Sequence, residues 1–187
     1  AMDMQDYARY WHGYVAFLRP ILNHLNYFDF RTLNSLAQIA LIMATVFIVW
    51  KEFGRKRYIL VMFTSYALLS PLTLLFSLQY FWVFYITYLM TCLVICKKEY
   101  LLQKQRYFYL FQLIGMLTAY FDLLTFPLLT WGFPLLWWIA ACGDRMSGKE
   151  RIKKTVLSGL AWVLGYGGMW GAKWVIASPV LGYNVVK

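Results

Sequence analysis

The sequence reads Tyr120-Phe121-Asp122-Leu123-Leu124-Thr125-Phe126-Pro127 where two long apolar runs, residues 107–121 and 123–141, meet. One carboxylate, Asp122, therefore lies between two segments that have the character of membrane helices. A lone carboxylate at that depth is costly unless it lies at a membrane surface, faces protein or contacts water. We interpret this segment as a turn at one membrane surface and place the other segments relative to it.

The composition indicates a membrane protein. The chain of 187 residues is 61% hydrophobic and 20% aromatic, with only 14% charged residues and a mean hydropathy of +0.54. Soluble domains usually carry about 25% charged residues, and abundant Trp and Tyr are typical of the interfacial belts of membrane proteins. The predicted fold is an all-α, polytopic integral membrane helix bundle.

Hydropathy predicts about six transmembrane helices and an outer interfacial amphipathic helix. The predicted spans are residues 33–50, 58–78, 81–96, 107–121, 123–141 and 155–177. Asn34 or Ser35 is the expected cap of the first span. Residues 1–32 form an extracytoplasmic segment with the amphipathic helix, for which a seventh span is the alternative, and residues 179–187 form a short outer tail.

The distribution of charge predicts the orientation. Most of the 18 basic residues fall in three alternate loops, residues 51–57, 97–106 and 145–154. The positive-inside rule makes these loops cytoplasmic, which predicts a multi-pass membrane protein. Nucleic-acid binding is not expected despite the net charge of +10, because the basic residues alternate with apolar runs. An outside N-terminus without a signal peptide leads us to expect an earlier membrane span in a longer protein.

Unusual polar and aromatic side chains gather on the predicted outer side. Asp122 is the candidate general base and His12 a second catalytic candidate, because a carboxylate or an imidazole can take a proton from a hydroxyl. The candidate substrate-binding residues are those whose cations can hold phosphate or whose rings can stack on a sugar. They are Arg9, Trp11, Arg19, Tyr120, Trp170 and Lys173.

These residues also have simpler interpretations. Asp122 can cap the helix that follows it, Arg9 and Arg19 can bind lipid headgroups, and Trp170 with Lys173 can anchor a helix at the interface. No metal site is expected, since no His or second Cys pair accompanies the cysteines, and no cofactor is expected.

Small residues repeat along the last predicted span. Ala161, Gly165, Gly168 and Ala172 lie on one face, and small residues let helix backbones approach closely in lipid. We expect this face to form contacts within the bundle or between copies in a homo-oligomer.

Several strings resemble a group of uncharacterised multi-pass membrane proteins of Gram-positive bacteria. They are residues 7–14 (YARYWHGY), 18–20 (LRP), 120–125 (YFDLLT), 165–170 (GYGGMW) and 173–174 (KW). The resemblance implies a location in a bacterial cell membrane and a membrane-anchored region ahead of this one, and it implies no activity. The architecture is also similar to that of C-type glycosyltransferases, whose signature acid lies in a region that this chain does not contain.

Three functions are compatible with these patterns. The leading hypothesis is a part of an outer-leaflet transferase acting on lipid-linked, polyprenyl-phosphate glycans, with membrane lipids and a lipid-linked sugar as partners. The alternatives are a transporter or flippase component, and a non-catalytic membrane scaffold. Whether the chain is an enzyme is left open by the sequence.

Overall fold

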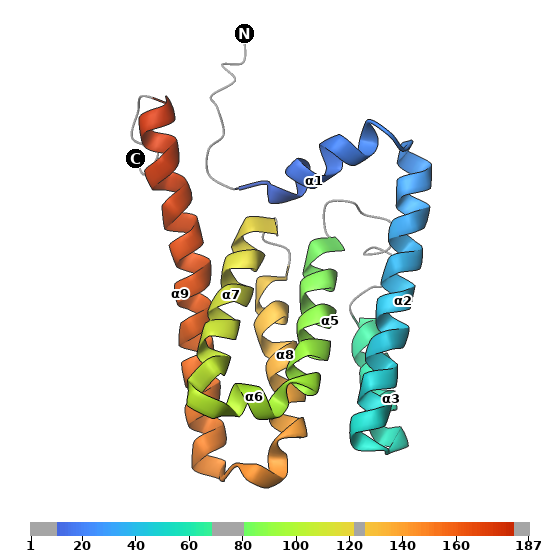
Figure 1. Cartoon of the computed structure of the whole chain (residues 1–187), viewed down its shortest axis with the longest axis vertical. Coiled ribbons are helices and arrows are strands. Elements are labelled where there is room, and N and C mark those ends of the chain that lie inside the picture. Colours follow the sequence, from blue (N-terminus) through green and yellow to red (C-terminus); the bar gives the residue numbers. More distant parts are fainter. Residues whose placement is uncertain (1–10, 69–80, 122–125, 182–187) are drawn as a thin grey trace.

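The computed structural model describes residues 11–68, 81–121 and 126–181, and this part of the chain is all-α, as predicted (Figure 1). The helices are α1 (Gly13–Leu22), α2 (Tyr27–Phe53), α3 (Lys56–Leu68), α5 (Phe81–Cys96), α6 (Lys98–Leu102), α7 (Arg106–Phe121), α8 (Pro127–Ala141) and α9 (Gly148–Leu181). Short 3₁₀ turns at Gln103–Gln105 and Gly143–Arg145 precede α7 and α9. The long helices run roughly side by side, and α1 lies across one end of them.

The number of predicted membrane spans is corrected by the structure. By length and composition, α2 is the one described helix that could cross a membrane, and the count rises to two if α5 and the α6–α7 segment, bent by 86°, form a single span. The predicted six is therefore too many. Hydropathy counts apolar residues without locating helix ends, and α8, for example, has only 15 residues because it begins at Pro127. Proline is favoured in the first helical turn, where its missing N–H costs nothing.

The beginning of α2 differs from the expected one. Asn26 caps the helix, and its side-chain oxygen accepts a hydrogen bond from the backbone N–H of Asp29 at 2.8 Å. The expectation of a cap at Asn34 or Ser35 is therefore wrong, and the boundary drawn between residues 32 and 33 falls inside α2. The helix ends at Gly54, whose φ of 60° suits a residue without a Cβ.

The last helix also begins earlier than expected. Ser147 and Glu150 form a capping box, in which the Ser147 N–H donates to the Glu150 carboxylate at 2.9 Å and the Glu150 N–H donates to Ser147 Oγ at 3.3 Å. α9 therefore starts at Gly148 rather than at residue 155. It continues through Pro179 to Leu181, so the predicted tail overlaps its last turn.

Close packing of α7 on α9 forms one half of the bundle, and α5 packs on α8 and α2 in the other half. At the α7–α9 contact, a Cβ added to Gly165 would lie 2.0 Å from the Gln112 carbonyl oxygen, and one added to Gly115 would lie 2.1 Å from the Trp162 carbonyl oxygen. The small-residue prediction thus holds at Gly165 for packing within the chain. At Gly168 an added Cβ meets no described atom within 4 Å.

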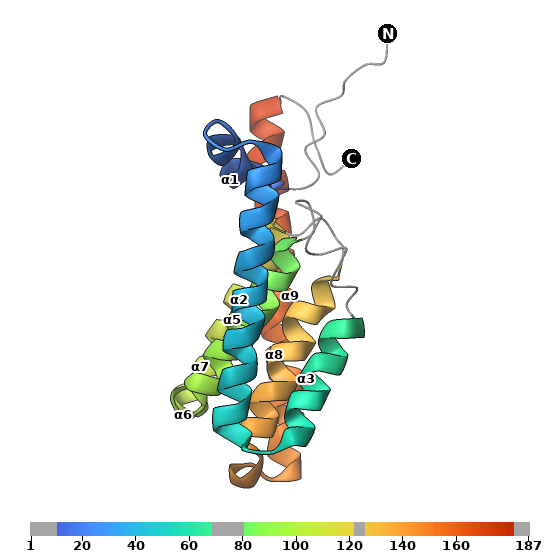
Figure 2. The same cartoon turned by 90° about the vertical axis from the view of Figure 1, so that its right-hand side faces the viewer.

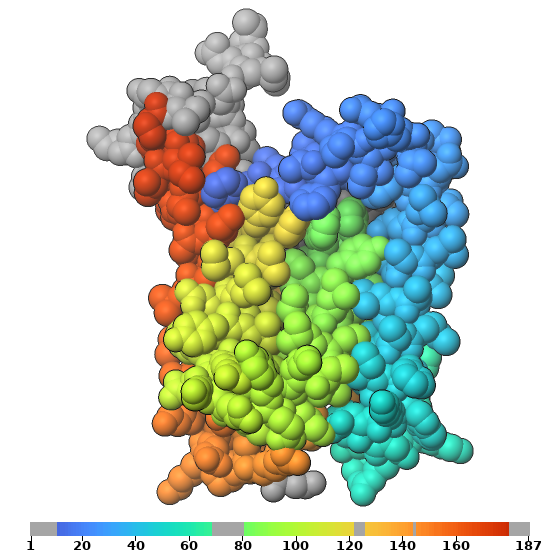
Figure 3. All heavy atoms as spheres, in the orientation of Figure 1, coloured from blue at the N-terminus to red at the C-terminus, as the bar shows by residue number. Residues whose placement is uncertain are grey.

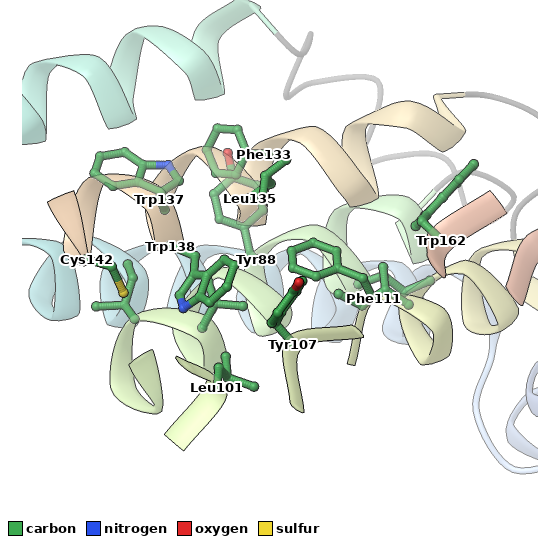
Figure 4. Packing of buried hydrophobic residues seen from close by; sticks show 14 of the residues in the cluster. Tyr88, Leu101, Tyr107, Phe111, Phe133, Leu135, Trp137, Trp138, Cys142 and Trp162 are labelled. Carbon is green, nitrogen blue, oxygen red and sulfur yellow. The ribbon is translucent and has the colours of Figure 1, made fainter. Parts of the chain in front are cut away.

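Aromatic side chains fill the space between α5, α7 and α8 (Figure 4). The Tyr107 and Trp138 rings stack with centroids 5.1 Å apart, and Tyr88 lies 5.5 Å from Phe133. Beside this cluster, Thr118 and Thr130 share a hydrogen bond of 2.7 Å. The hydroxyl of Thr130 also accepts from the indole N–H of Trp162 at 3.1 Å, so one buried polar network ties α7, α8 and α9 together.

The polarity of α2 is reversed relative to a helix of a soluble protein. Its buried face includes Asn34, Gln38 and Thr45, with Gln38 at 0% exposure. Its exposed face carries large apolar side chains, among them Leu36 at 58% and Phe47 at 65%. In a helix on the surface of a water-soluble protein the exposed face is usually the polar one.

The basic loops gather at the end of the bundle away from α1 (Figure 2). There Lys98 of α6 pairs with Glu52 at the end of α2, and Glu99 of α6 pairs with Arg145 in the turn before α9. These two ion pairs join three segments that are far apart in the sequence. The polar groups discussed below lie at the other end.

Candidate functional site

The candidate site is organised around Trp11, the first described residue. Its indole N–H donates a hydrogen bond of 2.7 Å to the carbonyl oxygen of Met169 on α9. Its ring lies 5.6 Å from that of Tyr120 at the end of α7, and the ammonium of Lys173 lies 5.0 Å from its centroid. Three of the predicted site residues, Trp11, Tyr120 and Lys173, are therefore brought together from three segments that are far apart in the sequence.

Gly13 allows this approach, because a Cβ there would lie 2.4 Å from the Tyr120 ring and 2.6 Å from its carbonyl oxygen. The N-terminal part of α1 can thus lie directly on the end of α7 (Figure 3). Neither the role of Gly13 nor the Met169 carbonyl was part of the sequence prediction. The Met169 carbonyl belongs to the backbone and leaves no signal in the sequence. Gly13, a glycine between aromatic residues, is a signal that the sequence does contain.

His12 lies beside Trp11 at the start of α1, with a left-handed φ of 50°. Its ring contacts that of Tyr14 edge-on, with the centroids 6.0 Å apart. A positive φ is uncommon for a residue with a Cβ and is found several times more often for His than for most residues. The structure places His12 at the same end as Tyr120, as the prediction of a common site requires.

The other predicted site residues are more dispersed. Arg19 is exposed on α1, about two helical turns from Trp11. Trp170 is half-buried on α9, where its ring lies 5.5 Å from that of Trp174. Arg9 and Asp122 lie outside the described residues.

A continuous aromatic wall leads from this cluster toward α2. Phe121 packs edge-on against Tyr120 and stacks on Trp82 of α5, with centroids 4.9 and 4.2 Å apart. Phe17 of α1 lies 5.5 Å from Phe121 and 5.4 Å from Trp82. The Lys173 end of the site is therefore connected through ring contacts to the space beneath α1.

That space is a cavity of about 490 Å³ between α1, α2 and α5. Its lining is apolar apart from Asn34, Tyr85 and the indole N–H of Trp82, and the Tyr85 hydroxyl donates to the Asn34 side-chain oxygen at 3.1 Å. Phe17, Ile21 and Leu25 recur at every fourth residue, and this spacing is the sequence signal for the apolar residues that cover the cavity. The sequence does not show that α1, α2 and α5 lie next to one another around this cavity.

Metal-ligating residues do not gather in the described part of the chain, where no three His, Cys, Asp or Glu side chains lie close enough to hold an ion. Comparison with known proteins gives no match to a family model, to a curated protein or to a solved structure.

Proposed function

We propose that this chain is an integral membrane protein that handles a lipid-linked, phosphate-bearing glycan at the membrane surface away from its basic loops. The membrane location is supported by the reversed polarity of α2. It is also supported by the exposed apolar side chains of α3 and α9, such as Leu60 at 69% and Val175 at 74% exposure. Apolar surface of this extent is rare on soluble monomers. In this arrangement the described helices are parts of a polytopic bundle.

The observation that carries the proposal about the site is the contact of Trp11 with Lys173 and Tyr120. A Lys ammonium is a strong donor to phosphate oxygens, and indole and phenol faces can stack on a sugar ring. The carbonyl of Met169 fixes the indole, so the platform is preorganised at little entropic cost.

The remaining roles follow from the residue chemistry. We assign Asp122 as the general base toward an acceptor hydroxyl, with His12 as the second proton-transfer group. Arg9, Arg19 and Trp170 complete the binding surface for the phosphate and the glycan.

The test is a cell-surface glycan assay of substitution variants. Lys173→Ala should lower the product strongly, and Lys173→Arg should restore part of it, because the arginine keeps the charge and the stacking. Asp122→Asn should abolish the product while the protein remains in the membrane. Lys149→Ala removes the same charge at the opposite end and serves as the matched control.

The reasoning fails if Lys173→Ala and Asp122→Asn give unchanged glycan at normal protein levels. Location is checked separately, by the resistance of the protein to extraction from membranes with alkaline carbonate. A cysteine placed at Arg57 should react with an impermeant maleimide only after cell lysis, whereas a cysteine at His24 should react in intact cells.

A second candidate function, a membrane scaffold, is favoured by the face of α9 that carries Gly167, Gly168 and Gly171. An added Cβ at any of the three meets no atom of the described residues within 4 Å. A glycine-lined face that is open in one copy suits contact with a second helix in lipid. Gly168→Leu should dissociate such an assembly without altering the glycan product. The oligomeric state of the protein in detergent would show this as a shift from oligomer to monomer.

A further inference from the structure

We propose that the cavity between α1, α2 and α5 holds the hydrocarbon chain of a single-chain lipid phosphate of the polyprenyl type, whose phosphate lies toward Lys173. This inference rests on the proposed function and assigns the lipid part of its substrate. The cavity volume of about 490 Å³ falls within the roughly 300–1,000 Å³ typical of small-molecule sites.

The chemistry of the walls selects a hydrocarbon. Phe30 and Leu33 of α2, Phe81 and Leu89 of α5, and Phe17 of α1 present carbon to the cavity. The two polar groups among them, Asn34 and Tyr85, already hydrogen-bond to each other at 3.1 Å. The amide of Asn34 and the hydroxyl of Tyr85 therefore do not require a polar ligand, and this part of the lining favours an apolar chain.

The shape of the cavity favours one chain over a protein segment. α1 lies over its outer end and contributes Phe17, Leu18 and Ile21 to its lining, so a partner helix cannot continue alongside α2 and α5 past this point. On α5 the lining residues extend from Phe81 to Leu89, which corresponds to about 12 Å of helix at roughly 1.5 Å per residue. A single extended hydrocarbon chain fits a cavity of this length.

The mouth of the cavity is continuous with the polar cluster. Phe121 stacks on Trp82 at the wall and contacts Tyr120, whose ring in turn contacts Trp11 beneath the Lys173 ammonium. A lipid with its chain beneath α1 can therefore extend its headgroup along this wall to a cation. An amphiphilic ligand requires such a connection between an apolar cavity and a cation. A purely apolar ligand would not use it.

An unpaired donor lies on the same wall. The indole Nε1 of Trp82 is buried, and no residue within 11–68, 81–121 or 126–181 accepts a hydrogen bond from it. A buried N–H without an acceptor is uncommon and calls for an explanation. An ester oxygen of a lipid phosphate at the mouth of the cavity would supply one.

The test is photo-crosslinking of the purified full chain in nanodiscs with a polyprenyl monophosphate that carries a diazirine in its chain. Adducts should map to residues 17–37 and 81–89. Ala37→Trp places an indole in the cavity, whereas Ala40→Trp places one on the same helix outside the lining. Ala37→Trp should lower crosslinking about tenfold or more, the equivalent of about two methylene groups losing their contacts, and Ala40→Trp should not.

Competition identifies the ligand. Unlabelled polyprenyl phosphate should displace the probe, while the uncharged polyprenol and two-chain phosphatidylcholine should do so poorly. Equal displacement by all three would show that the cavity takes bulk lipid only and would overturn the inference. So would equal crosslinking of the Ala37→Trp and Ala40→Trp variants, after both are shown to elute and melt alike.

These outcomes are separable from those of the proposed function. If Lys173→Ala lowers surface glycan while Ala37→Trp leaves crosslinking unchanged, the chain site is wrong and the function stands. If crosslinking depends on the cavity while surface glycan is indifferent to Lys173 and Asp122, the lipid site stands and the transferase role is wrong.

Discussion

The close contact of α7 and α9 makes a quantitative prediction for Gly165→Ala. The new Cβ would lie 2.0 Å from the carbonyl oxygen of Gln112, a contact that must open to at least 3.0 Å. The obstructing atoms belong to backbone and cannot rotate away, so the two helices must part. Overpacking of this kind costs about 1–3 kcal/mol, occasionally more.

The matched control is Gly168→Ala on the same helix, where an added Cβ meets no described atom within 4 Å. There the change should be neutral or slightly stabilising, because alanine is favoured over glycine in a helix by about 1 kcal/mol. Both variants gain this helix propensity, so they should differ in free energy of unfolding by the overpacking cost of about 1–3 kcal/mol, although they exchange the same atoms.

Unfolding of the purified chain in mixed micelles, followed by tryptophan fluorescence, measures this difference. A third variant, Gly115→Ala, tests the other side of the contact, where the obstructing atom is the Trp162 carbonyl oxygen at 2.1 Å. The double variant with Gly165→Ala should cost less than the sum of the single ones, since the helices need to part only once. Equal stability of Gly165→Ala and Gly168→Ala would refute the α7–α9 packing.

Three further predictions concern other parts of the bundle. Thr130→Val removes the acceptor of a buried indole N–H and should destabilise the chain by about 1–3 kcal/mol in the same unfolding assay; an unchanged midpoint would contradict the network. Burial raises the pKa of the Cys142 thiol to about 11, with a further contribution from the nearby Glu99 carboxylate, whereas Cys96 is exposed. Maleimide should therefore label Cys96 in the folded protein and Cys142 only after unfolding. Mass spectrometry of the labelled peptides would measure this difference. Hydrogen bonds from Ser147 lower the pKa of Glu150 from its ordinary 4.5, so their stabilisation is present above that pH and is lost as the pH falls through the lowered pKa. Ser147→Ala keeps the backbone N–H but removes the hydroxyl, so it should lower stability at neutral pH by about 0.5–2 kcal/mol and should weaken only part of this acid dependence. An unchanged stability at neutral pH would contradict the cap.

Helices in the middle of the chain were predictable because their apolar runs are bounded by clear signals. The predicted spans 81–96 and 107–121 match α5 and α7 to within one residue. Two helix starts were missed although the sequence contains their signals. Asn26 with Asp29 and Ser147 with Glu150 are capping pairs, but both precede polar turns of helix that hydropathy does not count.

Part of the candidate site was also predictable. The placement of basic residues in alternate loops separated the two ends of the bundle, and it grouped Trp11, Tyr120 and Lys173 at one of them. It could not show that Trp11 lies between the other two, because this contact depends on how α1 crosses the end of α7. The number of spans was overestimated, since a hydropathy window cannot tell a short helix from a long one that proline interrupts.

The amino-acid sequence alone determined the all-α class, the polarity of the two ends and the small-residue face of the last helix, because these follow from composition and from local periodicity. The tertiary structure decided which helices touch: the pairing of Gly115 with Gly165, the threonine network and the cavity beneath α1. Contacts of this kind arise from shape complementarity between segments distant in the chain, and no local pattern encodes which segment will be the partner.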